Sequence, residues 1–392
     1  MPRLSQVFRN SFWRIQTMNY SFPTAEPAGS PGQASPEPNL KEILAITALT
    51  VAIFVIFVCA IQNYLAKVDD FGDSLAYMTI ASAIRRWNFA GLVILQFWGL
   101  PYLMAALSII AGISDRTSLL AICFASALIS VVLAHKLWGG WIAGFFAVLN
   151  FDWLQRSLLG GSESLFVALI FGAFLAVRRG RWMIASLLAA LATSVRPLGL
   201  IALVAISVTL LWRQEFVKFA WAITIELAVG TLYALPLMLY FGGPMANVHG
   251  YNSHGHVLGF PFYAIIKGTV LYSSPWTNLM FTFAWILFAL AGNIAMFTSG
   301  EFRLYWRRFP VEGWFAVLYL LAIYCYNYPF WARGSFPRFV IPAVPFLLLA
   351  LSRWIPRDRR VLWTLATLSP LLAAVSATGI QTAASFLRRI LT

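Results

Sequence analysis

The sequence predicts an all-α polytopic membrane protein, built as a bundle of about 11–12 transmembrane helices. Three observations predict this fold class. Sixty per cent of the 392 residues are hydrophobic and only 11% are charged, whereas soluble domains carry roughly 25% charged residues. The mean hydropathy is +0.76. A membrane helix needs about 20 apolar residues, and such stretches follow one another along almost the whole chain after its first 42 residues.

The N-terminal segment differs from the rest. Residues 1–41 are polar and rich in Pro, Ser, Gly and Ala, a composition that cannot bury enough apolar surface to form a packed core. Its arginines favour the cytoplasmic side of the membrane. We therefore expect a disordered cytoplasmic tail at 1–41 and a single transmembrane domain at 42–392.

Twelve apolar runs are candidate spans. They lie at about 43–65, 91–112, 118–135, 139–153, 163–177, 182–195, 198–212, 216–240, 276–298, 313–328, 339–354 and 361–378. The basic loops between them predict which loops are cytoplasmic. The N-terminus and the basic loop at 178–181 are both predicted to be cytoplasmic, which requires an even number of crossings between them, but five apolar runs lie there. The topology between 66 and 177 therefore stays open at this stage.

The basic residues do not form the continuous basic stripe that is typical of a nucleic-acid-binding surface. The net charge is +14, but Arg and Lys lie in short clusters between apolar runs, as at 178–181, 303–308 and 357–360. This is the positive-inside pattern of cytoplasmic loops. The three cysteines all lie inside apolar runs, so they predict neither a disulfide framework nor a zinc site. We expect no nucleic-acid partner and no obligate protein partner.

An acidic loop follows the first span. Asp69, Asp70 and Asp73 lie within five positions, in a chain with only 14 carboxylates. Tyr77 and Ile80 follow Asp73 at spacings that place all three on one helical face, which predicts an amphipathic segment along the outer membrane surface. A carboxylate at the start of such a segment can accept a proton from a substrate hydroxyl, although carboxylates also serve simply to solvate a loop.

Four more charged residues are candidates for a site. Glu163 begins a span after two glycines, where a carboxylate also favours the helix dipole. Arg196 stands between two short apolar runs, which predicts a helical hairpin with this arginine at its outer tip. Arg333 and Arg338 lie in a later loop predicted to face the same side. Arginines against the positive-inside trend are costly, and they are suited to binding phosphate.

Aromatic and histidine residues complete the candidate set. Trp98 and Tyr102 open a span at the membrane interface, where aromatic residues are also common for structural reasons. His249, His254 and His256 lie in a glycine-rich loop at 241–262. With Tyr77, these residues are expected to line a substrate pocket. Metal binding by the histidines is a minor alternative, because no carboxylates lie nearby in the sequence, and metal dependence stays open.

Four short motifs, taken together, resemble the GT-C superfamily of membrane glycosyltransferases. The closest resemblance is to GPI mannosyltransferase II-type proteins and their bacterial relatives. The stretch "DSLAYMTIA" is similar to the family's W-D-x-x-x-Y-x-x-I-A, with Gly72 where Trp is usual, and "GSESLF" is similar to (S/T)-E-(S/P)-L-F. "SVRPLG" resembles R-P-N-G, with Leu198 in place of Asn, and "PRFVIPAVPF" resembles P-R-Y-x-x-P-x-x-P. The motifs occur in the family's order between about residues 43 and 355.

The resemblance implies an inverting transfer of a sugar, mannose above others, from a polyprenyl-phosphate sugar to an acceptor hydroxyl on the extracytoplasmic side. Asp73 would be the catalytic base, assisted by Asp69, Asp70 and Glu163. The lipid phosphate would be bound by Arg196, Arg338 and Arg333. No cofactor is expected beyond the lipid-linked donor and a possible divalent metal.

Two kinds of alternative remain. A lipid-linked saccharide transporter or flippase would also place Asp and Arg in an apolar bundle, but it predicts charges along both halves. An O-antigen ligase or polymerase-like enzyme would use similar lipids, but it predicts a larger late outer loop. Short basic loops favour a bacterial inner membrane over the endoplasmic reticulum. The expected partners are membrane lipids, the lipid-linked donor and a glycan or glycolipid acceptor.

Overall fold

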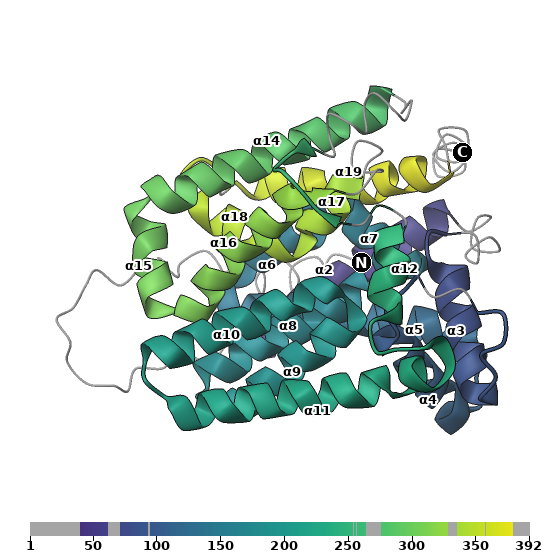
Figure 1. The fold of residues 1–392 in the computed structure, drawn as a ribbon. Coiled ribbons are helices and arrows are strands. Elements are labelled where there is room, and N and C mark those ends of the chain that lie inside the picture. The colour runs from purple at the N-terminus through teal and green to yellow at the C-terminus, as the bar shows by residue number, and fades with distance from the viewer. Residues whose placement is uncertain are drawn as a thin grey trace.

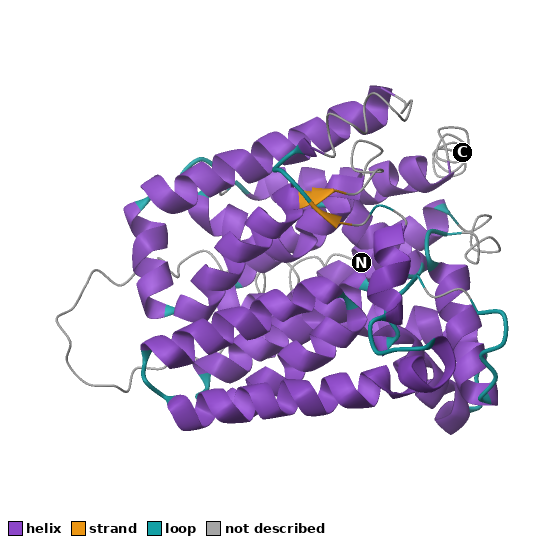
Figure 2. Ribbon diagram, viewed as in Figure 1, coloured by secondary structure: helices purple, strands orange, loops and turns teal. Residues whose placement is uncertain are grey.

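The computed structural model describes residues 40–61, 71–92, 95–253, 255, 257–263, 276–327, 335–356 and 358–378. The expected tail at 1–39 lies outside this part of the chain. Helices make up nearly all of the described structure, as Figure 2 shows, and its two strands are two residues long each. The predicted all-α polytopic membrane fold is therefore confirmed.

The helices of the first half of the chain are coloured purple to teal in Figure 1. They are α2 (Leu40–Ala60), α3 (Ser74–Arg86), α4 (Gly99–Ala111), α5 (Asp115–Trp138), α6 (Gly140–Leu149), α7 (Phe151–Leu159), α8 (Glu163–Arg178), α9 (Trp182–Val195), the 3₁₀ segment η3 (Pro197–Gly199), α10 (Leu200–Trp212) and α11 (Phe216–Phe241).

The second half adds a short helix, a two-stranded ladder and the remaining bundle helices. They are α12 (Ala246–Ser253), β1 (Val257–Leu258), α14 (Trp276–Thr298), α15 (Gly300–Arg308), α16 (Pro310–Cys325), β2 (Tyr326–Asn327), α17 (Ser335–Val340), η5 (Ile341–Ala343), α18 (Val344–Ala350) and α19 (Arg359–Thr378). Strands β1 and β2 pair antiparallel, with Val257 opposite Asn327.

Five helices in the described ranges are long and apolar enough to cross a membrane, and up to seven segments qualify if two bent helix pairs are each one span. Five further apolar helices are 10–17 residues long. Fewer helices therefore qualify as spans by length than the twelve apolar runs predict, because several of those runs are interrupted. The run at 91–112 becomes helical only at Gly99, and the run at 139–153 is divided at Asn150.

The side chain of Asn150 ends α6 and begins α7. Asn150 Oδ1 accepts a hydrogen bond from the backbone N–H of Asp152 at 2.9 Å and so caps α7. Its Nδ2 donates to the carbonyl of Pro337 at 2.7 Å. The break between α6 and α7 thus also fixes α17, the helix that carries Arg338, against the centre of the bundle.

The helices α5, α8 and α9 pack side by side as the centre of the bundle (Figure 1). Large aromatic side chains of α8, such as Phe166, Phe171 and Phe174, are fully buried. They pack with rings from other helices, for example Phe174 against Phe315 at a centroid distance of 5.2 Å. This interior is large and apolar, so an ionised side chain inside it is stable only when it has charged partners.

Glycines let α3 dock onto the break between α7 and α8. The two helices are bent by 107°, and Gly160 between them has a φ of +102°, a conformation that favours glycine. A Cβ at Gly160 would lie 2.7 Å from Ser74 Oγ and 2.8 Å from Leu119 Cδ2. The Ser74 hydroxyl donates to the carbonyl of Leu159 at 3.1 Å. The first turn of α3 therefore rests against the start of α8.

A helical hairpin of α9 and α10 has Arg196 at its turn, as predicted. Arg196 is extended, with φ −149° and ψ 137°, because a following proline disfavours the helical region. Gly199 completes the turn, since a Cβ there would lie 2.4 Å from the backbone nitrogen of Thr193. The tight turn holds the Arg196 side chain toward α8.

An ionic network lies at the C-terminal end of α8. Arg178 forms two hydrogen bonds to Glu312, of 2.6 Å from Nε and 2.8 Å from Nη2. Its Nη1 donates to the carbonyl of Leu137 at 2.6 Å. Tyr305 contacts both members of the pair and accepts a 2.7 Å hydrogen bond from Trp138 Nε1. This network links α5, α8, α15 and α16.

Candidate active site

Four of the charged residues singled out in the sequence lie together. Arg338 Nη2 donates to Asp73 Oδ2 at 2.8 Å, and Arg338 Nε donates to Glu163 Oε1. Arg196 Nη1 donates to the same oxygen of Glu163. We call these four residues the acid–arginine cluster. Its members come from the start of α3, the start of α8, the turn after α9, and α17.

Glu163 is the centre of this cluster. Its side chain is only 3% exposed and it pairs with both arginines through one oxygen. The second oxygen, Oε2, is buried and has no hydrogen-bond partner among the described residues. Pairing with two guanidinium groups compensates the cost of burying this carboxylate. Glu163 is therefore suited to hold the two arginines in a fixed relation to each other.

Asp73 differs from Glu163 because it is more accessible. Its side chain is 32% exposed. Arg338 occupies Oδ2, whereas among the described residues the hydrogen-bond contact of Oδ1 is a long one of 3.5 Å with Gln96 Nε2. Burial by itself raises the pKa of Asp73, but the positive charges of Arg338 and Arg156 outweigh it and hold the pKa below its ordinary value. Asp73 is thus an ionised carboxylate at neutral pH, with one oxygen that lacks a strong donor.

Hydroxyl groups connect α3 to the start of α8. Tyr77 is buried on the inner face of α3, and its hydroxyl donates to Ser162 Oγ at 3.1 Å. Arg196 Nη1 donates to the same Ser162 oxygen at 3.2 Å. Burial raises the pKa of Tyr77, with further contributions from Asp73 and Glu163, so its hydroxyl stays protonated. Tyr77 therefore lies beside the cluster, as the sequence predicted.

Arg156 is a further charged residue at the site, and it was not predicted from the sequence. This residue of α7 lies against the turn before Asp73: its Cζ is 4.7 Å from the centroid of the Phe71 ring, and a Cβ at Gly72 would lie 2.3 Å from its Nη1. Its Nε and Nη1 are buried without a hydrogen-bond partner within the described structure. The available signal was Asp152, four residues earlier on the same helix face. The two are the acidic and basic residues of an otherwise uncharged α7.

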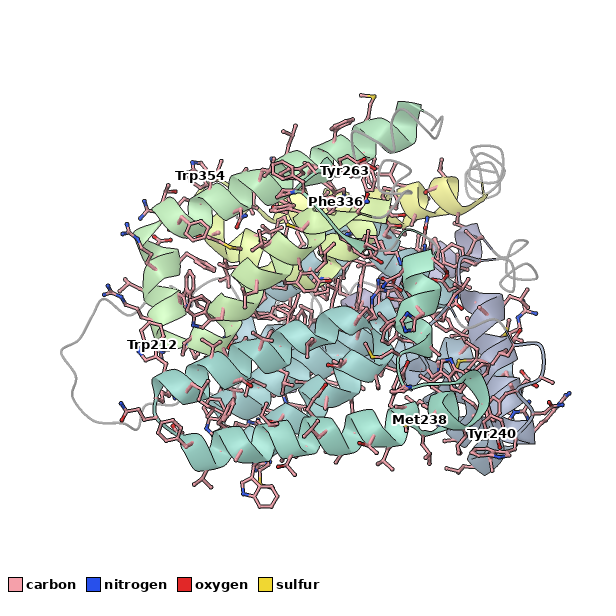
Figure 3. The ribbon with its side chains drawn as sticks, in the orientation of Figure 1. Trp212, Met238, Tyr240, Tyr263, Phe336 and Trp354 are labelled. Carbon is pink, nitrogen blue, oxygen red and sulfur yellow. The ribbon has the colours of Figure 1, made fainter. Side chains whose placement is uncertain are left out.

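Trp98 and Tyr102 lie in a different cluster. Trp98 is fully buried and packs against Phe89 and Phe241, at centroid distances of 5.6 and 5.7 Å. Tyr102 donates to the carbonyl of Tyr233 at 3.3 Å. These contacts tie α4 to the end of α11, near Tyr240 in Figure 3. These contacts give the two aromatic residues packing roles, and their place in a substrate pocket stays a prediction.

The helix α12 approaches the cluster from another side. Asn247 Nδ2 donates to the carbonyl of Gln96 at 2.6 Å, and the Phe97 ring packs edge-on against Tyr251 at 5.4 Å. His249, on the same short helix, is exposed. The helix therefore holds Gln96 beside Asp73. A role for His249 in a substrate pocket stays a prediction.

Five predicted site residues fall outside the described ranges: Asp69, Asp70, His254, His256 and Arg333. Within the described ranges, no group of three or more His, Cys, Asp or Glu side chains could hold a metal ion.

The fold and the cluster define a class. The protein is a multi-pass, all-α integral membrane protein. A solved structure with this fold is that of ArnT from Cupriavidus metallidurans bound to undecaprenyl phosphate, with a TM-score of 0.50 and 12% sequence identity. The match covers 85% of this chain and 63% of that chain, so the chain spans less than two thirds of ArnT. At this identity the likeness establishes the fold alone. No family model and no curated protein matches the sequence.

Proposed function

We propose that the protein is an inverting glycosyltransferase that moves a sugar from a polyprenyl-phosphate sugar to an acceptor hydroxyl. One observation carries the proposal: an ionised, accessible carboxylate, Asp73, shares Arg338 with a buried acid that also pairs with Arg196. A proton acceptor and two guanidinium groups thus lie within one cluster. Intramembrane charges of this kind are costly and mark functional sites.

The chemistry of this transfer matches the residues. Because phosphate is a good leaving group, the reaction needs no strong general acid, unlike hydrolysis of an ordinary glycoside, where a carboxyl group must protonate the leaving oxygen. One general base and cationic stabilisation of the departing phosphate suffice. Arginine is well suited to the second task because its planar group binds phosphate in two-point contacts.

The step assigns a role to each member of the cluster. The acceptor oxygen attacks the anomeric carbon, its bond to that carbon forms, and the bond from carbon to the phosphate oxygen breaks with inversion. The acceptor proton passes to Asp73, through the oxygen that Arg338 does not occupy. Arg196 and Arg338, with Arg333, bind the phosphate that leaves. Glu163 orients the two arginines, and Asp69 and Asp70 assist Asp73.

The lipid class of the donor is supported by the likeness to ArnT, whose solved structure holds undecaprenyl phosphate. Mannose is proposed from the resemblance of the four motifs to GPI mannosyltransferase II-type proteins. We place the active site at the extracytoplasmic face of a bacterial inner membrane, with a glycan or glycolipid as the acceptor and no obligate protein partner.

The proposal is tested with membranes containing the full-length protein and radiolabelled undecaprenyl-phosphate mannose. We expect transfer of label to an endogenous acceptor, and we expect Asp73→Asn to lower the rate by roughly 10²–10⁴-fold, the usual contribution of a general base. If label is only translocated across the membrane, the protein is a transporter. If the Asp73→Asn protein keeps near-normal transfer, the assignment of the base is wrong.

A matched control is an aspartate of α5 that pairs with an arginine of α3. Asp115 forms a 2.7 Å ion pair with Arg85 at the far end of α3, away from the cluster. Asp115→Asn therefore removes an aspartate–arginine pair from α3 without touching Asp73. We expect this variant to keep transfer activity within about twofold, since exposed ion pairs contribute little to stability.

A further inference from the structure

The helix α15 lies between two apolar helices and carries a concentration of positive charge. It starts two residues after α14, a candidate membrane span, and ends two residues before α16. It is bent by 119° from α16. A nine-residue helix bent this far does not extend α16 as a straight span, and it is too short to cross a bilayer by itself. This favours a position of α15 at the bilayer edge. Figure 1 shows it at one end of the bundle.

The outer face of α15 is basic. Arg303, Arg307 and Arg308 are exposed. Arg303 and Arg307 are one turn apart on the same helix face, and Arg308 lies about 100° further round the helix from Arg307. In the part of the chain that the structure describes, none of the three forms an ion pair with a carboxylate. The acid of this helix, Glu301, pairs with Arg353 at 3.0 Å. Figure 3 shows nitrogen-tipped side chains projecting from this end of the bundle.

The inner face of α15 is held rigidly. Phe302 and Tyr305 are buried, and the Tyr305 hydroxyl accepts hydrogen bonds from Trp138 Nε1 at 2.7 Å and from Arg178 Nη2 at 3.2 Å. The three exposed arginines therefore project from a fixed platform, so binding through them costs little ordering of the backbone.

Tryptophans mark the depth of this platform. Trp306 of α15 packs against Trp314 at a centroid distance of 5.2 Å, and Trp212 lies 6.4 Å from Trp314. Trp212, at the end of α10, is 75% exposed and points away from the bundle in Figure 3. Tryptophan is enriched at the headgroup level of membranes. These tryptophans therefore favour a position of α15 at the headgroup level, where the lipid phosphates are.

We infer that α15 is a binding surface for anionic phospholipid headgroups, with Arg303, Arg307 and Arg308 as the groups that contact lipid phosphate. Charge complementarity selects this partner, because the negative charge of a membrane leaflet attracts basic residues near its surface. The surface lies at the opposite end of α8 from the acid–arginine cluster, so the inference stands independently of the proposed function.

The test uses the purified full-length protein reconstituted in phosphatidylcholine vesicles that contain a minority of phosphatidylglycerol. After gentle detergent extraction, the lipids that remain bound are quantified by mass spectrometry. We expect phosphatidylglycerol to be enriched over its share in the vesicles, and high salt to reduce the enrichment by screening. Enrichment that is absent, or unchanged by salt, would overturn the inference without any variant.

Variants then localise the effect. The triple change of Arg303, Arg307 and Arg308 to Gln should lower the enrichment by roughly fivefold per arginine, and the same triple change to Lys should retain most of it. The control is Arg85→Gln with Arg86→Gln, at the end of α3, another amphipathic helix that ends in arginines; it should change the enrichment by less than about twofold. Equal losses in the control and the triple Gln variant, or in the Lys and Gln variants, would contradict the assignment to α15.

Discussion

Arg338 binds Asp73 and Glu163 with two different atoms of one guanidinium group: Nη2 lies 2.8 Å from Asp73 Oδ2, and Nε donates to Glu163 Oε1. The two acids belong to the starts of different helices, α3 and α8. The relationship therefore depends on the planar, forked shape of the guanidinium group and on α17 being fixed against the bundle.

Two replacements of Arg338 should distinguish the effect of its forked guanidinium group from the effect of its positive charge. Lysine keeps the charge but is a single-point donor that cannot hold both carboxylates in the same way, so we expect Arg338→Lys to fold and to lose most transfer activity. Arg338→Gln leaves Glu163 with one cation and should also destabilise the protein by about 3–5 kcal/mol, as for broken buried ion pairs. Thermal unfolding in detergent and the transfer assay measure the two effects. Full activity in Arg338→Lys would contradict the role of the fork.

The pH dependence of transfer should follow Asp73. Burial raises the pKa of Asp73, but Arg338 and Arg156 lower it further than burial raises it, while Glu163 opposes them and Tyr77 stays neutral. The base stays ionised below the usual carboxyl range, so activity should persist as the pH falls through that range and decline only beneath it. The same sign applies to stability: this contribution is present above the unfolded pKa and is lost as the pH falls through the folded pKa.

Arg156 provides the variant that checks this assignment. Removing its charge with Arg156→Gln should raise the pKa of Asp73, so the acidic limb of the pH–rate profile should move to higher pH, whereas Arg156→Lys should restore it. Arg85→Gln, which removes an arginine from the surface of α3, is the control and should leave the limb in place. An unshifted profile in Arg156→Gln would show that Arg156 does not act on the base.

Gly160 should be sensitive to a single methyl group. Gly160→Ala combines a φ of +102° with contacts of 2.7 Å to Ser74 Oγ and 2.8 Å to Leu119 Cδ2. Gly180→Ala is the matched control, because Gly180 has a φ of +70° but open space around its Cβ position. We expect Gly180→Ala to cost about 1 kcal/mol of unfolding free energy from backbone strain alone. Gly160→Ala should cost more and should lower transfer, because α3 is displaced; equal effects would exclude a role for the close approach.

The network at the far end of α8 should affect stability without affecting chemistry. Glu312→Gln leaves Arg178 without its charged partner beside Tyr305 and the carbonyl of Leu137, which should destabilise the protein by about 3–5 kcal/mol. The rate of transfer per folded molecule should stay within about twofold of the wild type. Unfolding curves combined with activity normalised to folded protein measure this. A selective loss of activity would instead link the network to catalysis.

Several local features follow directly from the sequence. The proline after Arg196 ends α9 at the predicted place, and the apolar periodicity after Asp73 predicts the inner face of α3 that carries Tyr77. These predictions succeed because backbone sterics and the helical repeat act over a few residues. Helix boundaries were less predictable where a side chain cuts an apolar run, as Asn150 does, because the residues next to the break, Leu149 and Phe151, are both apolar.

The sequence by itself determined that this chain is a helical membrane protein, and it singled out Asp73, Glu163, Arg196 and Arg338 as candidates because charges are costly in such a bundle. Only the tertiary structure decided that four of them meet, that Trp98 packs against Phe89 and Phe241, and that Arg156 lies against the turn before Asp73. The physical reason is that hydrophobicity and helical period are local properties of the chain. The partner of a buried charge, in contrast, is set by close approaches between distant helices, here permitted by Gly160 and Gly199.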